Sequence, residues 1–492
     1  MTGKFRHSFI LLVVLGLGCL LILSLLIFSM YTQPIYIWDE AIYANNALEM
    51  ANNHHYWLYT NNGIPDHYNS KPPLALWLQS LSFQLFSYTE FALRLPTLLA
   101  LLGILWLFFI FSKKLKLPTS IFIVASFILL TTKGTIRPHV FLSGDLDGIL
   151  VFFTTALCFI HLGQSGQQEI TNRKIVLSFI CLLAGYFTKS TAVLLILPPL
   201  LIGYLYTGNI GSLLKKKVLY IGCCLFCGLV IVYYYLRETY DPGYFQVVWD
   251  SEFKRYTSKV MSWQVQPFTF YFKNIATRFN PYYTFITMAL AIPYALLRDL
   301  QYRRWVVHIF LLCFVYIIII SIPVTKLEWY DAPIYPLWAF GLSIMLYEIY
   351  IVIEKKVSSP CIFAAIFTVT LSIMATFLVW QMYSELSAKR IYEPQEKEAA
   401  LLKQLDNTYH LPSYTVLMEV EENKLHHFDA LAFYIKSLRL NKQTNIILKR
   451  TIDDVLPGDT LVLVQHSKND SLRTRFDVKE IETGYVKILE KK

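Results

Sequence analysis

The chain has 492 residues and a formal net charge of +10; 16% of its residues are charged and 55% are hydrophobic. Soluble domains carry about 25% charged residues, so this composition does not fit a soluble domain, and it excludes a disordered chain, a collagen-like chain and a small disulfide-rich module. Most Lys and Arg residues stand in short clusters between apolar runs, and we therefore expect no nucleic-acid partner.

The first apolar run, residues 10–30, follows Lys4 and Arg6 in the manner of a signal peptide. It is longer than the apolar core of a signal peptide and no small-residue cleavage site follows it, so we predict a retained membrane span. About 20 apolar residues cross the hydrocarbon core of a membrane as a helix. We predict a polytopic α-helical membrane protein with eleven such spans: residues 9–30, 91–112, 118–137, 147–163, 174–188, 190–207, 217–236, 281–297, 305–323, 331–353 and 359–383.

The loops between these spans predict the topology, because Lys and Arg collect on the cytoplasmic side of a membrane. The basic clusters around Lys114, Lys216 and Lys355 fall on the same side as the N-terminus if residues 74–89 do not cross. That segment is short and contains polar residues, so we predict a helix lying in the outer interface. The protein is then a multi-pass protein of the plasma (inner) membrane with a cytoplasmic N-terminus. The predicted outer loops are residues 31–90, 138–146, 237–280 and 324–330.

The sequence changes sharply after residue 390, where long apolar runs give way to short alternating segments. The expected helices are residues 394–407 and 427–438, and the expected strands are residues 414–420, 444–449 and 459–465, with two more short strands after them. Helices and strands that alternate at this spacing predict a small α/β domain. The predicted domains are therefore a transmembrane domain of residues 1–390 and an extracytoplasmic, or periplasmic, α/β domain of residues 391–492.

The first outer loop begins with Trp-Asp-Glu-Ala-Ile-Tyr, which brings Asp39 and Glu40 close to the membrane surface. Asp39, Tyr43 and Asn46 are spaced i, i+4 and i+7, so they share one helical face. A carboxylate at the boundary between water and lipid can act as a general base. The alternative is a solvated helix start, where acidic side chains are favoured by the helix dipole.

Residues 68–73 of the same loop read Tyr-Asn-Ser-Lys-Pro-Pro. The two prolines favour an extended backbone before the interfacial helix, and Lys71 then holds its ammonium group at headgroup depth. A fixed cation at that depth suits a lipid phosphate. The alternative is a lysine that only extends to the membrane interface.

Two carboxylates, Asp145 and Asp147, stand just before the fourth predicted span. They could hold a metal, orient a nucleophile or cap the helix, with Asp145 as the N-cap. Lys326 and Tyr330 lie in a later short outer loop and share a face if that loop is helical; otherwise Tyr330 is an interfacial aromatic residue. All these features fall on one side of the membrane and the spans contain few ionisable groups, which argues against an ion channel or a proton-coupled transporter.

In this order, these residues resemble the GT-C glycosyltransferases of the protein O-mannosyltransferase and aminoarabinose (lipid A) transferase type, glycosyltransferase family 39. Asp39-Glu40 with Tyr43 is similar to the D-E motif in the first loop of that family, residues 68–77 are similar to its K-P-P segment, and Asp147 matches its second acidic position. The pattern covers residues 1–345 and is completed by residues 91–96, 187–189 and 325–333.

The resemblance implies a GT-C fold and the transfer of a sugar, with inversion, from a polyprenyl-phosphate donor to a lipid, protein or glycan acceptor on the outer face. It implies catalytic roles for Asp39 and Asp147 and binding of the donor phosphate by Lys71 and Arg255. The residues that it implies as lining the site are Glu40, Tyr43, Tyr68, Asp145, Lys326 and Tyr330. This chain has Ser70 where the family often has an acidic residue, so we predict no obligatory metal or cofactor, with a divalent cation as the alternative.

The competing interpretation is a non-catalytic membrane protein, either a polyprenyl-lipid flippase or an assembly scaffold. A flippase should have polar residues deep inside its spans, and this chain has few. A scaffold would not need Asp39, Lys71 and Asp147 together. We therefore predict an enzyme of the glycosyltransferase class.

Overall fold

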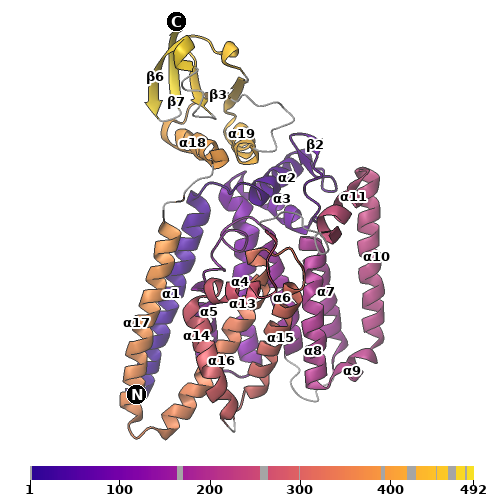
Figure 1. Ribbon diagram of the computed structural model, residues 1–492, viewed down its shortest axis with the longest axis vertical. Helices are drawn as coiled ribbons and strands as arrows, with labels where there is room; N and C mark the ends of the chain where they lie inside the picture. The colour runs from indigo at the N-terminus through magenta and orange to yellow at the C-terminus, as the bar shows by residue number, and fades with distance from the viewer. Residues whose placement is uncertain are drawn as a thin grey trace. The chain divides into compact units, whose positions relative to one another are not determined.

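The computed structural model of the chain divides into two compact units (Figure 1). The first unit contains Met1–Met30, His67–Ala75 and Arg94–Ala388, and the second contains Tyr31–Asp66, Leu76–Leu93 and Lys389–Lys492. The residues that the structure describes are 3–162, 170–254, 264–297, 300–388, 390, 394–417, 428–449, 451–463, 472–482 and 485–491.

The first unit is built from helices, which follow from the long apolar runs of the sequence. Its first helices are α1 (Gly3–Thr32), α4 (Glu90–Lys114), α5 (Thr119–Leu130), α6 (Asp147–Leu162), α7 (Asn172–Lys189), η1 (Ser190–Ile196), α8 (Leu197–Thr207), α9 (Ile210–Leu214) and α10 (Lys217–Tyr240). The later ones are α11 (Tyr244–Val248), η2 (Trp249–Phe253), α13 (Phe270–Arg278), α14 (Pro281–Leu296), α15 (Arg303–Ser321), η4 (Glu328–Ile334), α16 (Tyr335–Lys356) and α17 (Pro360–Ser387).

In the described part of the chain, seven helical stretches are long and apolar enough to cross a membrane, whereas we predicted eleven spans. One reason is that α5, α6 and α14 have 12, 16 and 16 residues, fewer than the roughly 20 that cross the hydrocarbon core. The helix predicted for residues 118–137 ends early, at Leu130, because residues 131–146 form turns that carry polar residues of the candidate site. The hydropathy of the sequence alone does not show that this helix ends at Leu130.

The other reason is that residues 172–207 count as one stretch although the chain reverses inside it. Ser190 follows α7 with φ 50°, a conformation in which an α-helix does not continue. Ile175, near the start of α7, packs in one cluster with Tyr204, near the end of α8. The two helices therefore run antiparallel, as expected from the separate predicted spans at 174–188 and 190–207.

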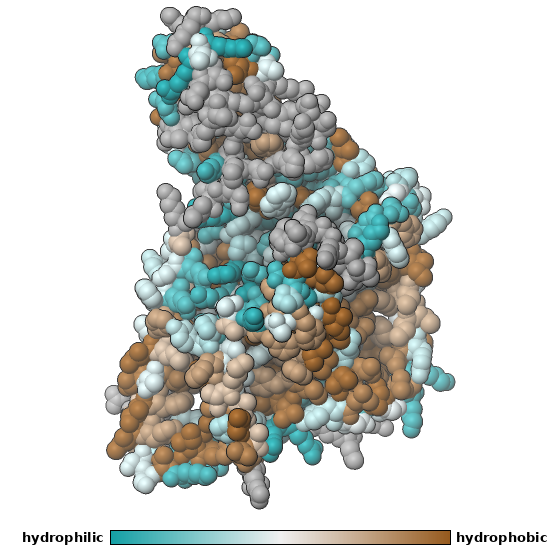
Figure 2. All heavy atoms as spheres, viewed as in Figure 1, coloured by the Kyte–Doolittle hydropathy of each residue, from teal (hydrophilic) through white to brown (hydrophobic). Residues whose placement is uncertain are grey.

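Apolar side chains cover the outward faces of these helices, and Figure 2 shows hydrophobic residues over much of their surface. On α14 the exposed apolar side chains are Phe285, Met288, Ile292 and Leu296. On α17 they are Ile362, Ile366, Val369 and Ile373. Spacings of three and four residues place each set on one helical face, and an apolar face of this size is stable in contact with lipid. The protein is therefore a multi-pass membrane protein.

The second unit contains the α/β tail together with segments of the first outer loop. Its elements are α2 (Asp39–Asn53), β1 (Thr60–Asn61), β2 (Ile64–Pro65), α3 (Leu74–Phe86), α18 (Pro394–Tyr409), β3 (Ser413–Leu417), α19 (Asp429–Lys442), β4 (Asn445–Lys449), η6 (Ile452–Asp454), β5 (Thr460–Leu463), β6 (Phe476–Glu482) and β7 (Tyr485–Lys491). Each helix and strand predicted for the tail is present. At 13 residues, α3 is too short to cross a membrane, which agrees with the predicted non-crossing helix.

The sheet of the tail has the strand order β4-β3-β5-β7-β6. β3 lies parallel to both β4 and β5, and β7 is antiparallel to β5 and β6. Alternating side chains on β5 and β7, Leu461, Leu463, Val486 and Ile488, pack into one apolar cluster with Phe476. This alternation explains why the short apolar segments of the tail form a sheet and not further spans.

Within the second unit, α19 of the tail is bound to α2 of the first outer loop by buried polar contacts. The Lys436 ammonium group lies 2.6 Å from Glu49 Oε1 and donates to Asn45 Oδ1 at 2.9 Å. Asp429 accepts a hydrogen bond from Asn61 at 2.8 Å. The tail and the segment from residue 31 to 66 therefore form a single folded unit.

Candidate active site

The segment that carries Lys71 is held in the first unit by the chain around the end of α10. His67 Nε2 lies 2.6 Å from Asp241 Oδ1, and the Tyr244 hydroxyl donates to the Ser70 carbonyl at 2.9 Å. Asp241 is itself 3.1 Å from the buried guanidinium of Arg237. These contacts fix the backbone on the N-terminal side of Lys71, and the prolines that follow remove two N–H groups and restrict φ.

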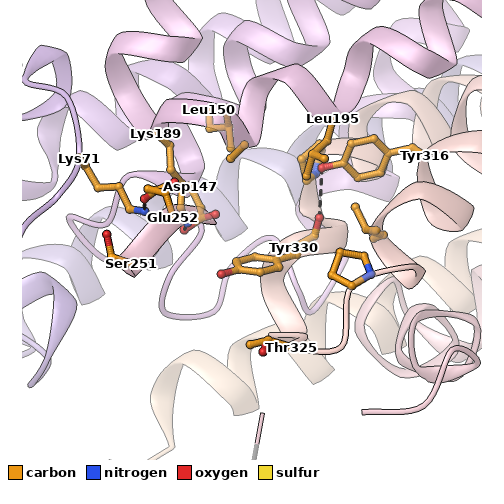
Figure 3. Close-up of a pocket in the computed structure, with 14 residues that line it drawn as sticks. Lys71, Asp147, Leu150, Lys189, Leu195, Ser251, Glu252, Tyr316, Thr325 and Tyr330 are labelled. Carbon is orange, nitrogen blue, oxygen red and sulfur yellow. Dashed lines mark hydrogen bonds and ion pairs between the residues drawn. The ribbon is translucent and has the colours of Figure 1, made fainter. Parts of the chain in front are cut away.

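Lys71 lines a pocket of the first unit to which α6, α7, η1, η2, α15, η4 and the loop between α15 and η4 also contribute (Figure 3). Its polar lining residues are Lys71, Asp147, Lys189, Ser251, Glu252, Thr325, Tyr316 and Tyr330. Its apolar lining residues are Leu150, Ala192, Leu195, Ile320, Pro323 and Pro333. Figure 3 shows the charged side chains gathered on one side of the pocket, with the Tyr330 ring directed toward them. The pocket thus joins an ionic part to an apolar part.

The ionic part consists of two ion pairs. Lys71 is paired with Glu252 of η2, and the two side chains are 17% and 6% exposed. Lys189, the last residue of α7, is paired with Asp147, and these side chains are 12% and 8% exposed. The Lys189 ammonium group also lies 5.5 Å from the centre of the Tyr330 ring, within the range of a cation–π contact.

Asp147 is the first residue of α6, and the start of that helix is tightly packed. A Cβ atom on Gly148 would come within 2.4 Å of the Val140 carbonyl oxygen and 2.5 Å of Thr97, so only glycine fits there. Close packing of this kind holds the first turn of α6 in place. It also gives the Asp147 carboxylate a fixed position at the pocket.

Asp145 is buried beside Asp147 and accepts a hydrogen bond from Ser143. Its other carboxylate oxygen lies 3.5 Å from His139 Nδ1, and the His139 ring stacks on Trp329 at 3.8 Å. Burial raises the pKa of the Asp145 carboxyl group. The contacts with His139 and Ser143 lower that pKa and, with the charge of Lys189, outweigh the effect of burial, so the pKa lies below its ordinary value. Asp145 and His139 of the first unit are close enough to bind the same divalent cation. The divalent cation that we gave as the alternative to a metal-free site stays a prediction.

Lys326 is buried next to the pocket and does not line it. Its ammonium group donates to the carbonyl oxygens of Gln266 and Pro323 at 2.9 and 2.5 Å, and burial lowers its pKa. η4 begins at Glu328, so Lys326 precedes the helical turn. The condition for a helical face shared by Lys326 and Tyr330 is therefore not met; of the two, Tyr330 lines the pocket.

The other predicted residues are not among the described residues that line the pocket. Asp39, Glu40 and Tyr43 belong to α2 in the second unit; α2 begins at Asp39, and Glu40 is buried and accepts from the Tyr36 backbone N–H at 2.7 Å. Glu40 is thus not part of a solvated helix start. Tyr68 is 64% exposed and is not among the pocket residues. Arg255 lies outside the described residues. The roles of these residues stay predictions.

Glu252 is a pocket residue that the sequence did not identify, and Lys189 was recognised only as part of the family pattern. Glu252 is 181 residues from Lys71 in sequence, so no local motif joins them. The only signal was the mixture of acidic and basic residues in the predicted loop 237–280. For Lys189, the signal was a lysine placed at the end of an apolar run.

Comparisons with known proteins agree with this architecture. Residues 70–235 match the family model for dolichyl-phosphate-mannose-protein mannosyltransferase. No curated protein sequence matches the chain. The structure is similar to ArnT from Cupriavidus metallidurans, solved bound to undecaprenyl phosphate, with a TM-score of 0.63 and 14% identity over 96% of this chain and 97% of ArnT. The apo state of ArnT gives a TM-score of 0.61 at 13% identity, with the same shares of the two chains covered.

A second, more distant similarity links the chain to the oligosaccharyltransferase from Archaeoglobus fulgidus, with a TM-score of 0.53 and 13% identity. That match covers 86% of this chain and 64% of the oligosaccharyltransferase. The resemblance inferred from the D-E motif, the K-P-P segment and Asp147 is thus confirmed at the level of fold, and the chain has the GT-C fold of these glycosyltransferases, with residues 70–235 matching the mannosyltransferase family model.

Proposed function

We propose that the protein is an inverting glycosyltransferase that moves a sugar from a polyprenyl-phosphate donor to an acceptor at the extracytoplasmic face of the membrane. The observation that carries this proposal is the pocket, where the ammonium groups of Lys71 and Lys189 stand beside an apolar wall. A lipid phosphate has the same two parts, an anion and an apolar chain. The similarity to a structure of ArnT bound to undecaprenyl phosphate supports this class of donor.

The chemistry needs little beyond positioned charge. The acceptor oxygen forms a bond to the anomeric carbon from one face, and the bond from that carbon to the phosphate oxygen breaks on the other face. The polyprenyl phosphate leaves with an additional negative charge, which a nearby ammonium group such as that of Lys71 stabilises. In the proposal, Asp39 takes the proton of an acceptor hydroxyl, while Asp147 holds Lys189 at the pocket.

The acceptor is a hydroxyl group of a lipid A-like glycolipid, a protein or a glycan, or a phosphate group, for which no base is needed. The competing function is a polyprenyl-lipid flippase or an assembly scaffold. Each ion pair of the pocket contains a lysine, and an enzyme would use its ammonium group to stabilise the departing phosphate. A scaffold has no need of a pocket with buried charges.

The test uses the purified full-length protein in liposomes with radiolabelled polyprenyl-phosphate sugars and total membrane acceptors. We expect a labelled product whose formation falls in Lys71→Ala by about ten- to a hundredfold, the range for loss of one charge-assisted contact to phosphate. Lys254→Ala is the matched control, because Lys254 is an exposed lysine paired with Asp250 just after η2. Transbilayer movement of the lipid without a labelled product would favour the flippase.

A further inference from the structure

We propose that Glu252 is an internal counter-anion: it occupies the Lys71 ammonium group while the pocket is empty, and the phosphate group of the donor has to replace it. This inference rests on the proposed function and adds a residue that sets the affinity for the donor. It predicts that removing the charge of a buried ion-pair partner improves binding, which a purely structural role does not predict.

Three donors from two segments converge on the Glu252 carboxylate. Lys71 contributes its ammonium group, Ser70 its hydroxyl group at 3.4 Å, and Thr191 of η1 its hydroxyl group at 3.3 Å. Such a set of one cation and two hydroxyl groups is the kind of cradle that binds a phosphate oxygen. In this structure a carboxylate of the protein itself fills the cradle.

The charges of the pocket support the replacement of Glu252 by the donor phosphate at the Lys71 ammonium group. Among the described residues that line the pocket, the ammonium groups of Lys71 and Lys189 are paired with the carboxylates of Glu252 and Asp147. A phosphodiester adds a negative charge to a site where all four side chains are largely buried. An unpaired buried charge is strongly unfavourable, so an incoming anion that takes the place of one carboxylate at its lysine keeps the charges of these four side chains balanced.

Local structure indicates which carboxylate leaves. Asp147 stands on the first turn of α6, which the close contact at Gly148 holds in place. Glu252 stands on η2, a five-residue π-helical turn. Single π-helical turns are rare and occur frequently at functional sites. We therefore assign the movement to Glu252 and the fixed position to Asp147.

Substitution of Glu252 by Gln separates this role from a supporting one. Glutamine keeps the length of the side chain and an oxygen that accepts from Lys71, but it has no charge to compete with phosphate. Charge-assisted hydrogen bonds are about twice as strong as neutral ones, which corresponds to an expected gain of about fivefold in affinity for a phosphate lipid. If Glu252 only holds Lys71 in position, Glu252→Gln should weaken binding.

The experiment measures the Kd of undecaprenyl phosphate for the full-length protein in detergent by titration calorimetry. We expect tighter binding by Glu252→Gln and weaker binding by Lys71→Ala. Asp250→Asn is the matched control: it removes the same charge from the same turn, but Asp250 is exposed and paired with Lys254. Its Kd should equal that of the wild type.

A second variant covers the case in which Glu252→Gln does not fold. Glu252→Asp keeps the charge but shortens the side chain by one methylene group, so its carboxylate competes less well for the Lys71 ammonium group, and binding should tighten by about twofold. Wild-type affinity or weaker binding in the folded variants overturns the counter-anion role while the proposed function stands. If the wild type does not bind undecaprenyl phosphate, the proposed donor class is wrong and the counter-anion role falls with it.

Discussion

The pair formed by Asp147 and Lys189 gives the most direct test of how the pocket is held together. Asp147→Asn and Lys189→Met each remove one charge and leave the other in a largely buried place, since the two side chains are 8% and 12% exposed. Breaking a buried ion pair from one side is more destabilising than removing both partners. We therefore expect both single variants to be less stable than the double variant Asp147→Asn/Lys189→Met.

The size of the effect has an upper limit set by proton transfer. An orphaned lysine can become neutral at pH 7 for about 4.6 kcal/mol, and an orphaned aspartate for about 4.2 kcal/mol, so neither single variant should lose more than this. In Asp147→Asn, the Tyr330 ring near Lys189 offsets about 0.5–1 kcal/mol of the loss. We expect losses of about 3–4 kcal/mol for each single variant and a coupling of at least about 2 kcal/mol in the double-mutant cycle.

Unfolding in mixed detergent and SDS micelles, followed by tryptophan fluorescence, measures these differences. The exposed pair Asp250–Lys254 supplies a matched cycle, Asp250→Asn with Lys254→Met, in which we expect little change in stability. If the losses of Asp147→Asn and Lys189→Met simply add in the double variant, the two side chains do not depend on each other. The reasoning from burial would then be refuted.

Asp39→Asn keeps the shape of the side chain but removes its basicity, so turnover should fall by about 10²–10⁴ while undecaprenyl phosphate still binds; near-wild-type turnover would exclude Asp39 as the base. In intact cells, an impermeant thiol reagent should label a cysteine placed at Lys403 but not one placed at Lys114, and the reverse pattern would contradict the predicted topology. Burial raises the pKa of Asp145, but the contacts with His139 and Ser143 and the charge of Lys189 together outweigh it, so the folded pKa is lowered and Asp145 stabilises the fold above the ordinary Asp pKa of about 3.9. That contribution is lost as the pH falls through the lowered pKa, so Asp145→Asn should flatten the acid side of a plot of Tm against pH; an unchanged acid side would show that Asp145 contributes no pH dependence.

Features that depend on a continuous stretch of sequence could be predicted. The order of the helices follows from apolar runs, and the tail follows from alternating short segments, since each of these patterns is read over neighbouring residues. Lys71 could be identified because two prolines fix the backbone just after it. The start of α2 at Asp39 was also readable, because acidic residues favour the first turn of a helix.

Features that depend on tertiary pairing could not be predicted. Glu252 meets Lys71 across 181 residues, and Asp147 meets Lys189 across 42 residues, so neither pair leaves a spacing signal. Lys326 illustrates the same limit: its position in a motif suggested the pocket lining, but its ammonium group is directed to backbone carbonyls. Sequence alone indicates which residues carry charge, and only the fold determines where each charge points.

The two ion pairs also explain how two ammonium groups are held in a largely buried pocket, which we propose binds an anionic lipid. An ammonium group in a largely buried apolar site needs an anion, and Glu252 and Asp147 supply one for Lys71 and one for Lys189. Stability of the empty pocket and affinity for the donor are then opposed wherever a carboxylate and the phosphate use the same ammonium group. Substitutions that strengthen the Lys71–Glu252 pair should therefore stabilise the protein and weaken its hold on the donor. Substitutions that strengthen the Asp147–Lys189 pair should stabilise it without that loss, because Asp147 keeps its place when the donor binds.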